Sequence, residues 1–311
     1  MSCRLVKRKH ITHHVIVSRL LHAIIYLLLL ALAFVFLYPF LYMIVTSLMS
    51  SEDLNNFTVE WIPRSLHFAN YRLAAKLMNL GAGFKNSVIV TVFSTLGQLL
   101  SCSMAGYGLA RYRFPGKKAF FFVIILAMIV PAQTIIIPQY LMYAQFGWLN
   151  TYLPLIVPCF FGFGFKGALY IYIFRQFYLG LPRELEAAAR VDGCGFIRTY
   201  VRIIFPTART AYVVVLVLSL VWNWSNYFEP SMYLSKSNMY TLSMCLNNIT
   251  DALSLSADTL STVYSVNDGN TLNNAVLMAG AFLVILPVGI AFAFLQKKFV
   301  QGIERTGLTG E

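Results

Sequence analysis

Six long apolar runs constrain the fold of this chain more than any other feature. Each approaches or exceeds the roughly 17–25 residues that a helix needs to cross a bilayer. Only 12% of the 311 residues are charged, against about 25% in soluble domains, and the mean hydropathy is +0.67. Backbone groups in lipid must bond within their own segment, which a helix achieves. We therefore expect an all-α integral membrane protein with six transmembrane helices near residues 20–46, 87–110, 119–143, 152–174, 212–228 and 275–295.

The positive charge is distributed unevenly between these runs. Of the 24 Lys and Arg residues, 18 lie before the first run, in the second and fourth loops, and after the last run. Cytoplasmic loops of membrane proteins carry such an excess. We therefore predict a multi-pass protein of the cell membrane with both termini in the cytoplasm. We expect residues 1–19 to form a basic cytoplasmic tail and residues 20–311 a single transmembrane domain. Because the topology explains where the basic residues lie, the net charge of +12 does not imply a nucleic-acid partner.

Side chains capable of catalysis or metal binding are scattered. The five cysteines have no paired spacing, which supports neither a disulfide framework nor a zinc site. Three histidines, His10, His13 and His14, lie in the basic tail, and the others are His22 and His67. No clustered catalytic set is present in the sequence, so we expect a protein that is not an enzyme and that holds no metal.

The interval between the fourth and fifth runs is polar and has the signals of two short helices. Pro182 suits the first residue of a helix, and Gly193 suits its end. A second helix is predicted from about 196 to 204, with Pro206 at the approach to the fifth run. Two helices at a turn make a rigid knob for a groove on another protein. The alternative is an amphipathic helix lying on the inner membrane face.

The same interval resembles the coupling loop of binding-protein-dependent ABC importers. Residues 184–193 read Glu-Leu-Glu-Ala-Ala-Ala-Arg-Val-Asp-Gly and residues 203–206 read Ile-Ile-Phe-Pro. Sugar permeases of this family have Glu-Glu-Ala-Ala-Arg-Ile-Asp-Gly followed by Ile-x-Leu-Pro. The resemblance extends over nearly the whole chain. It indicates a permease of the carbohydrate-uptake class, similar to the maltose-type permease with six spans. Further segments similar to the family are 106–116, 131–140, 150–152, 174–177 and 181–184.

Three departures from the family pattern bear on the coupling loop. In strict register the family's glutamate falls on Ala187, and Glu186 lies one position upstream; Phe205 replaces a leucine and Thr210 a proline. One position rotates a helical side chain by about 100°. An ion pair that the family's glutamate makes therefore cannot be assigned to Glu186 by alignment alone. Docking of the loop on a partner depends instead on its shape and on Gly193.

The resemblance implies the composition of a complete transporter. A second permease subunit would pair with this one, two ATP-binding subunits would lie beneath, and an extracytoplasmic sugar-binding protein would dock above. ATP and Mg would be held by the partner subunits, so this subunit would bind no cofactor and hydrolyse nothing. The outside loop 230–274 would reach toward the binding protein. The coupling loop would span 182–206, with ATPase-coupling residues Glu184, Glu186, Ala187, Ala188, Ala189, Asp192, Gly193 and Pro206.

An aromatic and amide-rich string at the end of the fifth run is a candidate for substrate contact. Aromatic faces stack on sugar C–H surfaces and amides bond hydroxyl groups, which suits Trp222, Asn223, Trp224 and Asn226. The alternative is an aromatic belt at the membrane interface.

Lys166 is the second candidate for the substrate path. It lies nine residues before Arg175, about 13 Å along a helix. A lysine at the membrane centre costs roughly 2.5–3.5 kcal/mol on insertion scales. We therefore expect Lys166 to face a wet cavity and to favour an acidic saccharide. The alternative is a structural bond to carbonyls near Pro154 or Pro158, or to the partner permease.

Two other functions remain open at this level. An ABC permease for a non-sugar solute, such as a phosphonate or an amino acid, would share the same architecture. A secondary carrier acting without an ATPase would need internal repeats and paired intramembrane charges.

Overall fold

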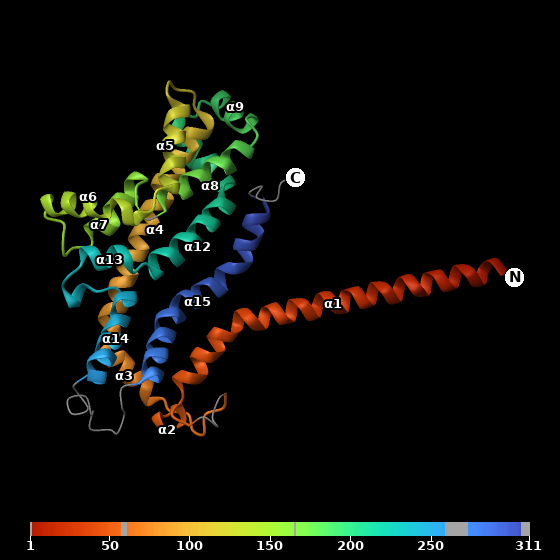
Figure 1. The fold of residues 1–311 in the computed structure, drawn as a ribbon. Helices are drawn as coiled ribbons and strands as arrows, with labels where there is room; N and C mark the ends of the chain where they lie inside the picture. The colour runs from red at the N-terminus through yellow and green to blue at the C-terminus, as the bar shows by residue number, and fades with distance from the viewer. Residues whose placement is uncertain (1, 57–60, 165, 259–272, 306–311) are drawn as a thin grey trace. The chain divides into compact units, whose positions relative to one another are not determined.

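The computed structural model describes residues 2–56, 61–164, 166–258 and 273–305, and within these it leaves the side chains of 2–17, 254–258 and 302–305 undescribed. The described residues form helices, turns and loops, with no β-strand among them (Figure 1). The chain divides into two compact units, one of residues 1–72 and 261–282, the other of 73–260 and 283–311. The predicted all-helical class is confirmed for the described residues.

In the first unit, one asparagine holds the end of the long helix α1 (Ser2–Ser47). The side-chain amide of Asn70, in α3 (Ala69–Leu77), donates to the carbonyl oxygens of Ser47 and Met49, each at 2.9 Å. The Tyr71 hydroxyl lies 2.6 Å from the Ser47 hydroxyl. The last carbonyls of a helix have no partner within the helix, so Asn70 satisfies groups that would otherwise lack one.

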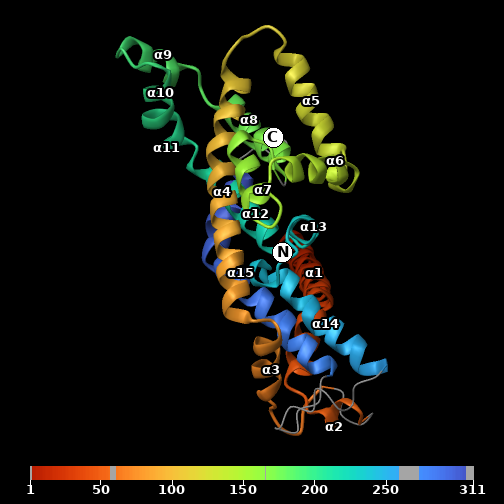
Figure 2. The ribbon, with the colours of Figure 1, turned by 90° about the vertical axis from the view of Figure 1, so that its left-hand side faces the viewer.

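The second unit is built around α4 (Leu80–Arg111). Helices α8 (Gly167–Gly180) and α12 (Arg209–Ser225) pack against it (Figures 1 and 2). A Cβ atom placed on Gly106 would lie 2.7 Å from the Cβ of Phe174, so the two helices come together where a glycine leaves room. A glycine at this position thus allows the two helices to pack closely.

Among the described residues, three helical stretches are long and apolar enough to cross a membrane: Ser18–Ser47, Leu80–Arg111 and Asn274–Gln301. Two bent pairs also qualify. The helices α5 (Lys117–Ile129) and α6 (Ala132–Gln145) meet at 103°, and Phe196–Thr207 meets α12 at 77°. Counting each bent pair as one span gives up to five spans in the described part of the chain. The multi-pass architecture is confirmed at this coarser level.

The fourth apolar run, 152–174, is broken and does not form the unbroken helix that we predicted. A short helix α7 (Leu153–Ile156) leads into a 3₁₀ helix at Val157–Phe161, and α8 begins only at Gly167. Gly162 and Lys166 both have positive φ, 71° and 64°. Prolines at 154 and 158 lack N–H donors, and a left-handed residue ends a helix. Lys166 is therefore the residue before α8, outside any helix interior.

The long segment after the fifth run is partly helical where it is described. It contains α13 (Phe228–Tyr233) and α14 (Leu242–Asp258), whereas residues 259–272 of the predicted outside loop lie outside the described residues. Asn150, with φ 57°, fixes α13: its N–H donates to the Tyr233 carbonyl, and its side-chain oxygen accepts from the Ser235 N–H. A single left-handed asparagine thus joins the turn after α6 to the segment after α12.

Gly106→Ala tests the close approach of α4 to α8. The added methyl group would meet Phe174 and backbone atoms of α8, and overpacking of this kind costs about 1–3 kcal/mol. We expect a lower melting temperature of the purified protein in detergent. Gly108→Ala is the matched control because nothing lies within 4 Å of its Cβ position. Equal melting temperatures for the two variants would contradict the packing argument.

Candidate functional site

The polar insert folds as a compact helical knob in the second unit. It consists of α9 (Glu184–Val191), α10 (Phe196–Thr199), a π-helical turn at Tyr200–Ile204 and α11 (Phe205–Thr207), which contains Pro206 (Figure 2). Helix α9 starts at Glu184, so Pro182 precedes the helix instead of opening it. Gly193 has φ 71°, and the N–H of the next residue, Cys194, donates to the Ala189 carbonyl at 2.9 Å. The predicted end of this helix at Gly193 is confirmed.

Apolar side chains of the knob are exposed, and Ala187, Ala188 and Val191 share one face of α9 by helical spacing. Val191 is 89% exposed and Ile197 70% exposed, and Ala187 and Ala188 are also exposed. Ala189, by contrast, is buried. Among the predicted coupling residues, Glu184, Asp192 and Gly193 are exposed as well. Apolar surface of this kind, rimmed by polar residues, is typical of protein–protein contact sites.

Glu186 contacts the chain's own helix α4. Its Oε1 lies 3.3 Å from Nε of Arg111, the last residue of α4, and the two side chains are only 13% and 4% exposed. The two atoms are not aligned as a hydrogen bond, so the contact is primarily a charge interaction. Arg111 also donates through Nη2 to the Leu181 carbonyl. The acid that is displaced from the family register therefore anchors the knob within this subunit.

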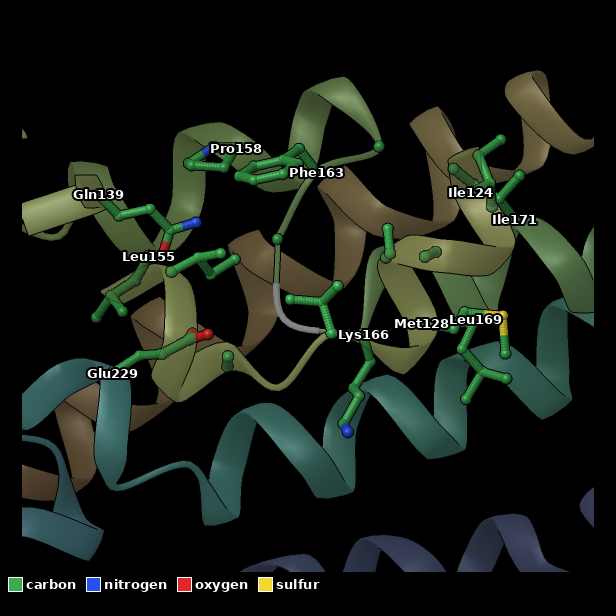
Figure 3. A pocket seen from close by; sticks show the side chains of 18 of the residues that line it. Ile124, Met128, Gln139, Leu155, Pro158, Phe163, Lys166, Leu169, Ile171 and Glu229 are labelled. Carbon is green, nitrogen blue, oxygen red and sulfur yellow. The ribbon is translucent and has the colours of Figure 1, made fainter. Parts of the chain in front are cut away.

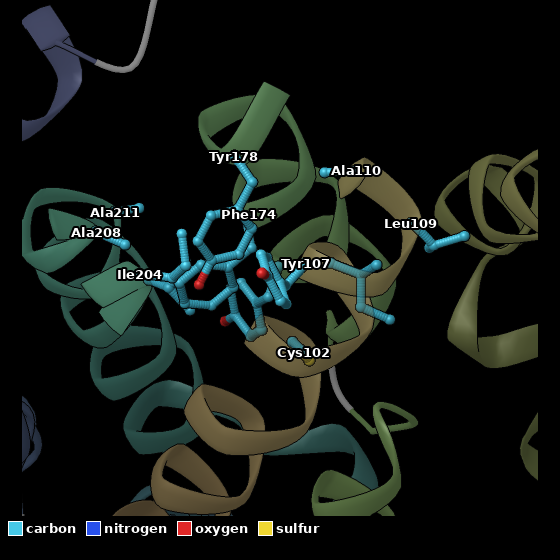
Figure 4. Packing of buried hydrophobic residues seen from close by; sticks show 12 residues of the cluster. Cys102, Tyr107, Leu109, Ala110, Phe174, Tyr178, Ile204, Ala208 and Ala211 are labelled. Carbon is cyan, nitrogen blue, oxygen red and sulfur yellow. The ribbon is translucent and has the colours of Figure 1, made fainter. Parts of the chain in front are cut away.

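Aromatic stacking fixes the second helix of the knob to the same end of α4. The ring of Phe196 stacks on the buried Tyr107, with centroids 5.8 Å apart, and meets Tyr112 edge-on at 5.2 Å. Tyr107 also packs on Tyr200 at 5.3 Å. Figure 4 shows Tyr107 in one cluster with Phe174, Tyr178 and Ile204. The knob and the membrane helices thus share a core.

Four hydroxyl groups meet inside that core. Ser103 Oγ lies 2.5 Å from the Tyr178 hydroxyl and 2.7 Å from the Tyr200 hydroxyl, and it also contacts the Tyr212 hydroxyl. Tyr200 and Tyr212 are 2.7 Å apart at their hydroxyls. Buried polar groups are costly unless they bond one another. Tyrosines in apolar runs carry no sequence signal of a shared partner, so this cluster was not predicted.

A cavity of about 550 Å³ is the second candidate site. Helices α5, α6, α8, α12 and α13 line it together with the broken segment before α8 (Figure 3). Its volume is typical of small-molecule sites, which are about 300–1,000 Å³. Lys166 and Trp222 both line it, and Lys166 Nζ lies 5.1 Å from the centre of the Trp222 ring. Two of the five predicted substrate-path residues therefore meet in one cavity.

An acid lies in the same cavity. Glu229, from α13, lines it and accepts a 3.1 Å hydrogen bond from the side-chain amide of Asn226. Burial raises the pKa of the Glu229 carboxyl, while the Asn226 amide and the charge of Lys166 oppose that rise. Asn226 itself does not line the cavity, but it holds the Glu229 carboxylate that does. The sequence offered a signal for Glu229, namely an acid beside Pro230 at the end of an apolar run, but we did not select it.

The remaining two substrate-path candidates pack between helices. Trp224 is buried, and its indole N–H donates to the Val284 carbonyl at 2.9 Å. The Asn223 amide donates to the side-chain oxygen of Gln98 at 3.1 Å and to Ser219. Neither residue lines the cavity.

Comparison with known proteins identifies the family of this chain. The model of the family "Binding-protein-dependent transport system inner membrane component" matches residues 97–305. An arabinooligosaccharides transport system permease protein of Halalkalibacterium halodurans is 30% identical over 282 residues, covering 90% of this chain and 93% of the relative. A probable starch degradation products transport system permease protein of Thermoanaerobacterium thermosulfurigenes is 29% identical, covering 88% and 91%.

A solved structure shares the fold. A chain in the crystal structure of a bacterial ABC transporter involved in the import of the acidic polysaccharide alginate superposes with a TM-score of 0.76 at 23% identity, covering 90% of this chain and 97% of that one. The relatives are transport permease proteins and not enzymes. With its apolar helices and a family match over more than half its length, this chain belongs to the inner-membrane permease family of binding-protein-dependent transport systems.

Proposed function

We propose that this chain is the permease subunit of an ATP-driven oligosaccharide importer. It works beside a second permease, two ATP-binding subunits that hold ATP and Mg, and an extracytoplasmic sugar-binding protein. The chain crosses the membrane six times with both termini in the cytoplasm, the broken segment 152–180 counting as one crossing. Relatives named for arabinooligosaccharides and for starch degradation products support the substrate class.

One observation carries this proposal: the exposed apolar face of the knob is joined to a buried core. A partner that moves the exposed face at Val191 and Ile197 also moves Glu186 and Phe196. These two residues bear on Arg111 and Tyr107 at the end of α4, so displacement passes directly to a membrane helix. Each partner then binds one of two global arrangements of the helices more tightly than the other, and this difference in affinity couples the partners.

Lys166 carries the proposal for an acidic substrate. Its ammonium group lies over Trp222 in the cavity, where it can pair with a carboxylate of the sugar while the indole stacks on the ring. Glu229, which lines the same cavity, would accept hydrogen bonds from hydroxyl groups of the sugar.

A second candidate substrate class is a phosphorylated polyol. The sn-glycerol-3-phosphate transport system permease protein of Agrobacterium fabrum is 26% identical over 276 residues, covering 86% of this chain and 91% of the relative. A phosphate ester would use the same Lys166 cation.

Ala188→Arg tests docking of a partner on the knob. A long charged side chain on the exposed face would prevent an ATP-binding subunit from seating, without disturbing the buried contacts of α9. We expect sugar uptake by intact cells to fall by about tenfold or more, which equals about 1.4 kcal/mol of lost interaction. Ser65→Arg, at an exposed serine outside both the knob and the predicted spans, is the control and should keep normal uptake. Equal uptake in both variants would remove the basis for docking at this face.

Glu186→Ala tests the anchor between the knob and α4. Removing one partner leaves the largely buried Arg111 without its counter-charge, so we expect a loss of about 1–3 kcal/mol in unfolding free energy. Thermal unfolding of the purified transporter measures it. Glu184→Ala, on the exposed side of the same helix, should change stability by less than about 0.5 kcal/mol. ATP hydrolysis in the Glu186 variant should continue while uptake declines.

Lys166→Gln tests the charge preference of the cavity. Uptake of a uronate-containing oligosaccharide and of glycerol 3-phosphate should fall, and uptake of a neutral oligosaccharide should persist. Lys85→Gln, at an exposed lysine that does not line the cavity, serves as the control. Unchanged anionic uptake in the Lys166 variant would show that this lysine is structural.

A further inference from the structure

A second cavity, of about 510 Å³, opens between the start of α12 and the last turns of α15 (Asn274–Arg305). It shares no lining residue with the Lys166 cavity. Of its lining residues, Tyr212 also belongs to the buried hydroxyl cluster described above. The residues that line it are Phe205, Arg209, Thr210, Tyr212, Val213, Lys298 and Gln301.

The polar wall of this cavity is basic. Arg209 and Lys298 come from helices far apart in the sequence and converge on one space, with the Thr210 hydroxyl and the Gln301 amide beside them. Both ion pairs among the described side chains, Arg111 with Glu186 and Arg64 with Asp53, lie elsewhere. A general excess of positive charge on cytoplasmic loops accounts for basic residues at these two positions, but it does not require that they share a cavity.

The other wall is apolar. The Phe205 ring is 45% exposed and meets the Tyr212 ring edge-on at 4.7 Å, and Val213 continues the surface. A free inorganic anion gains nothing from such a wall. A ligand with a phosphate group at one end and a hydrocarbon chain at the other fits both walls.

The position of the cavity matches the boundary of the membrane. Arg209 is the first residue of α12, and Lys298 lies in the last turn of the apolar stretch that ends at Gln301. Arg209 thus lies at the bend between the helical knob and α12, three residues before the predicted fifth run, and Lys298 lies near the end of the last span. Both line one cavity with Phe205 of the knob, so both cations lie on the same side as the knob. With the orientation proposed above, this side is the cytoplasmic leaflet, where anionic headgroups are found and basic pockets between helices bind them.

We infer that this cavity binds the phosphate-bearing headgroup of an anionic phospholipid, with one acyl chain along Phe205 and Val213. The inference rests on the proposed orientation but not on the transported sugar. Bound lipid bridges α12 and α15, and it lies against Tyr212, one member of the buried hydroxyl cluster. The ligand thus contacts the same core that receives the knob.

The test is a thermal-shift titration of the purified complete transporter with phosphatidylglycerol and, separately, with phosphatidylcholine. We expect phosphatidylglycerol alone to raise the melting temperature. Arg209→Gln and Lys298→Gln should each raise the half-maximal lipid concentration by about fivefold, because each cation near a charged membrane surface contributes about that factor. Lys297→Gln is the matched control, since this neighbouring exposed lysine does not line the cavity.

Each alternative outcome has its own signature. An unchanged titration in both single variants would overturn the site, and so would an equal shift in the Lys297 variant. A rise of the same size with inorganic phosphate would show that the cavity holds a free anion and no lipid. Loss of the ATP-binding subunits from the purified variants, with the lipid response intact, would identify the basic wall as a subunit contact. Because the readout uses neither sugar nor ATP, its failure is separate from failure of the transport assignment.

Discussion

The close packing of α4 against α8 and α12 is the constraint on which the second unit depends. Lipid offers no hydrophobic drive for helix association, so contact area and polar contacts must hold the helices together. Gly106 supplies the area, and Ser103 supplies the polar contact through its hydroxyl. The knob is attached to one end of α4, and the Lys166 cavity is built on its two neighbours. Neither site would have its present geometry if α4 were displaced.

Much of this arrangement was predictable where the cause is local. Apolar run length located α4 and α15, and the left-handed Gly193 fixed the end of α9. The break before α8 depends on a left-handed lysine, a conformation that no lysine favours in isolation, so the sequence predicted a continuous helix instead. The pairing of Glu186 with Arg111 joins positions 75 residues apart, and helical periodicity carries no information on such a contact.

The two candidate sites differ in how their residues were found. The predicted coupling residues lie in one contiguous motif, so the resemblance proposed all of them at once. In the structure several of them are exposed, whereas Glu186 lies against Arg111. The cavity residues come from several helices. Lys166 was selected because a charge inside an apolar run is costly, whereas Glu229 lies at the end of its run, where that cost is not evident from the sequence.

The broken fourth segment has a consequence for recognition. The 3₁₀ helix ends at Phe161 and α8 begins only at Gly167, and irregular backbone within a membrane is tolerated where it is covered by protein or borders water. Gly162, Phe163 and Gly164 line the Lys166 cavity, so in the proposed transport path their peptide groups would be part of the wall that a solute meets. A ligand rich in hydroxyl groups can bond to main-chain atoms at this wall, whichever side chains surround it. Selectivity built on peptide groups depends on the course of the chain, so it would persist through many side-chain replacements and change when the turn itself changes shape.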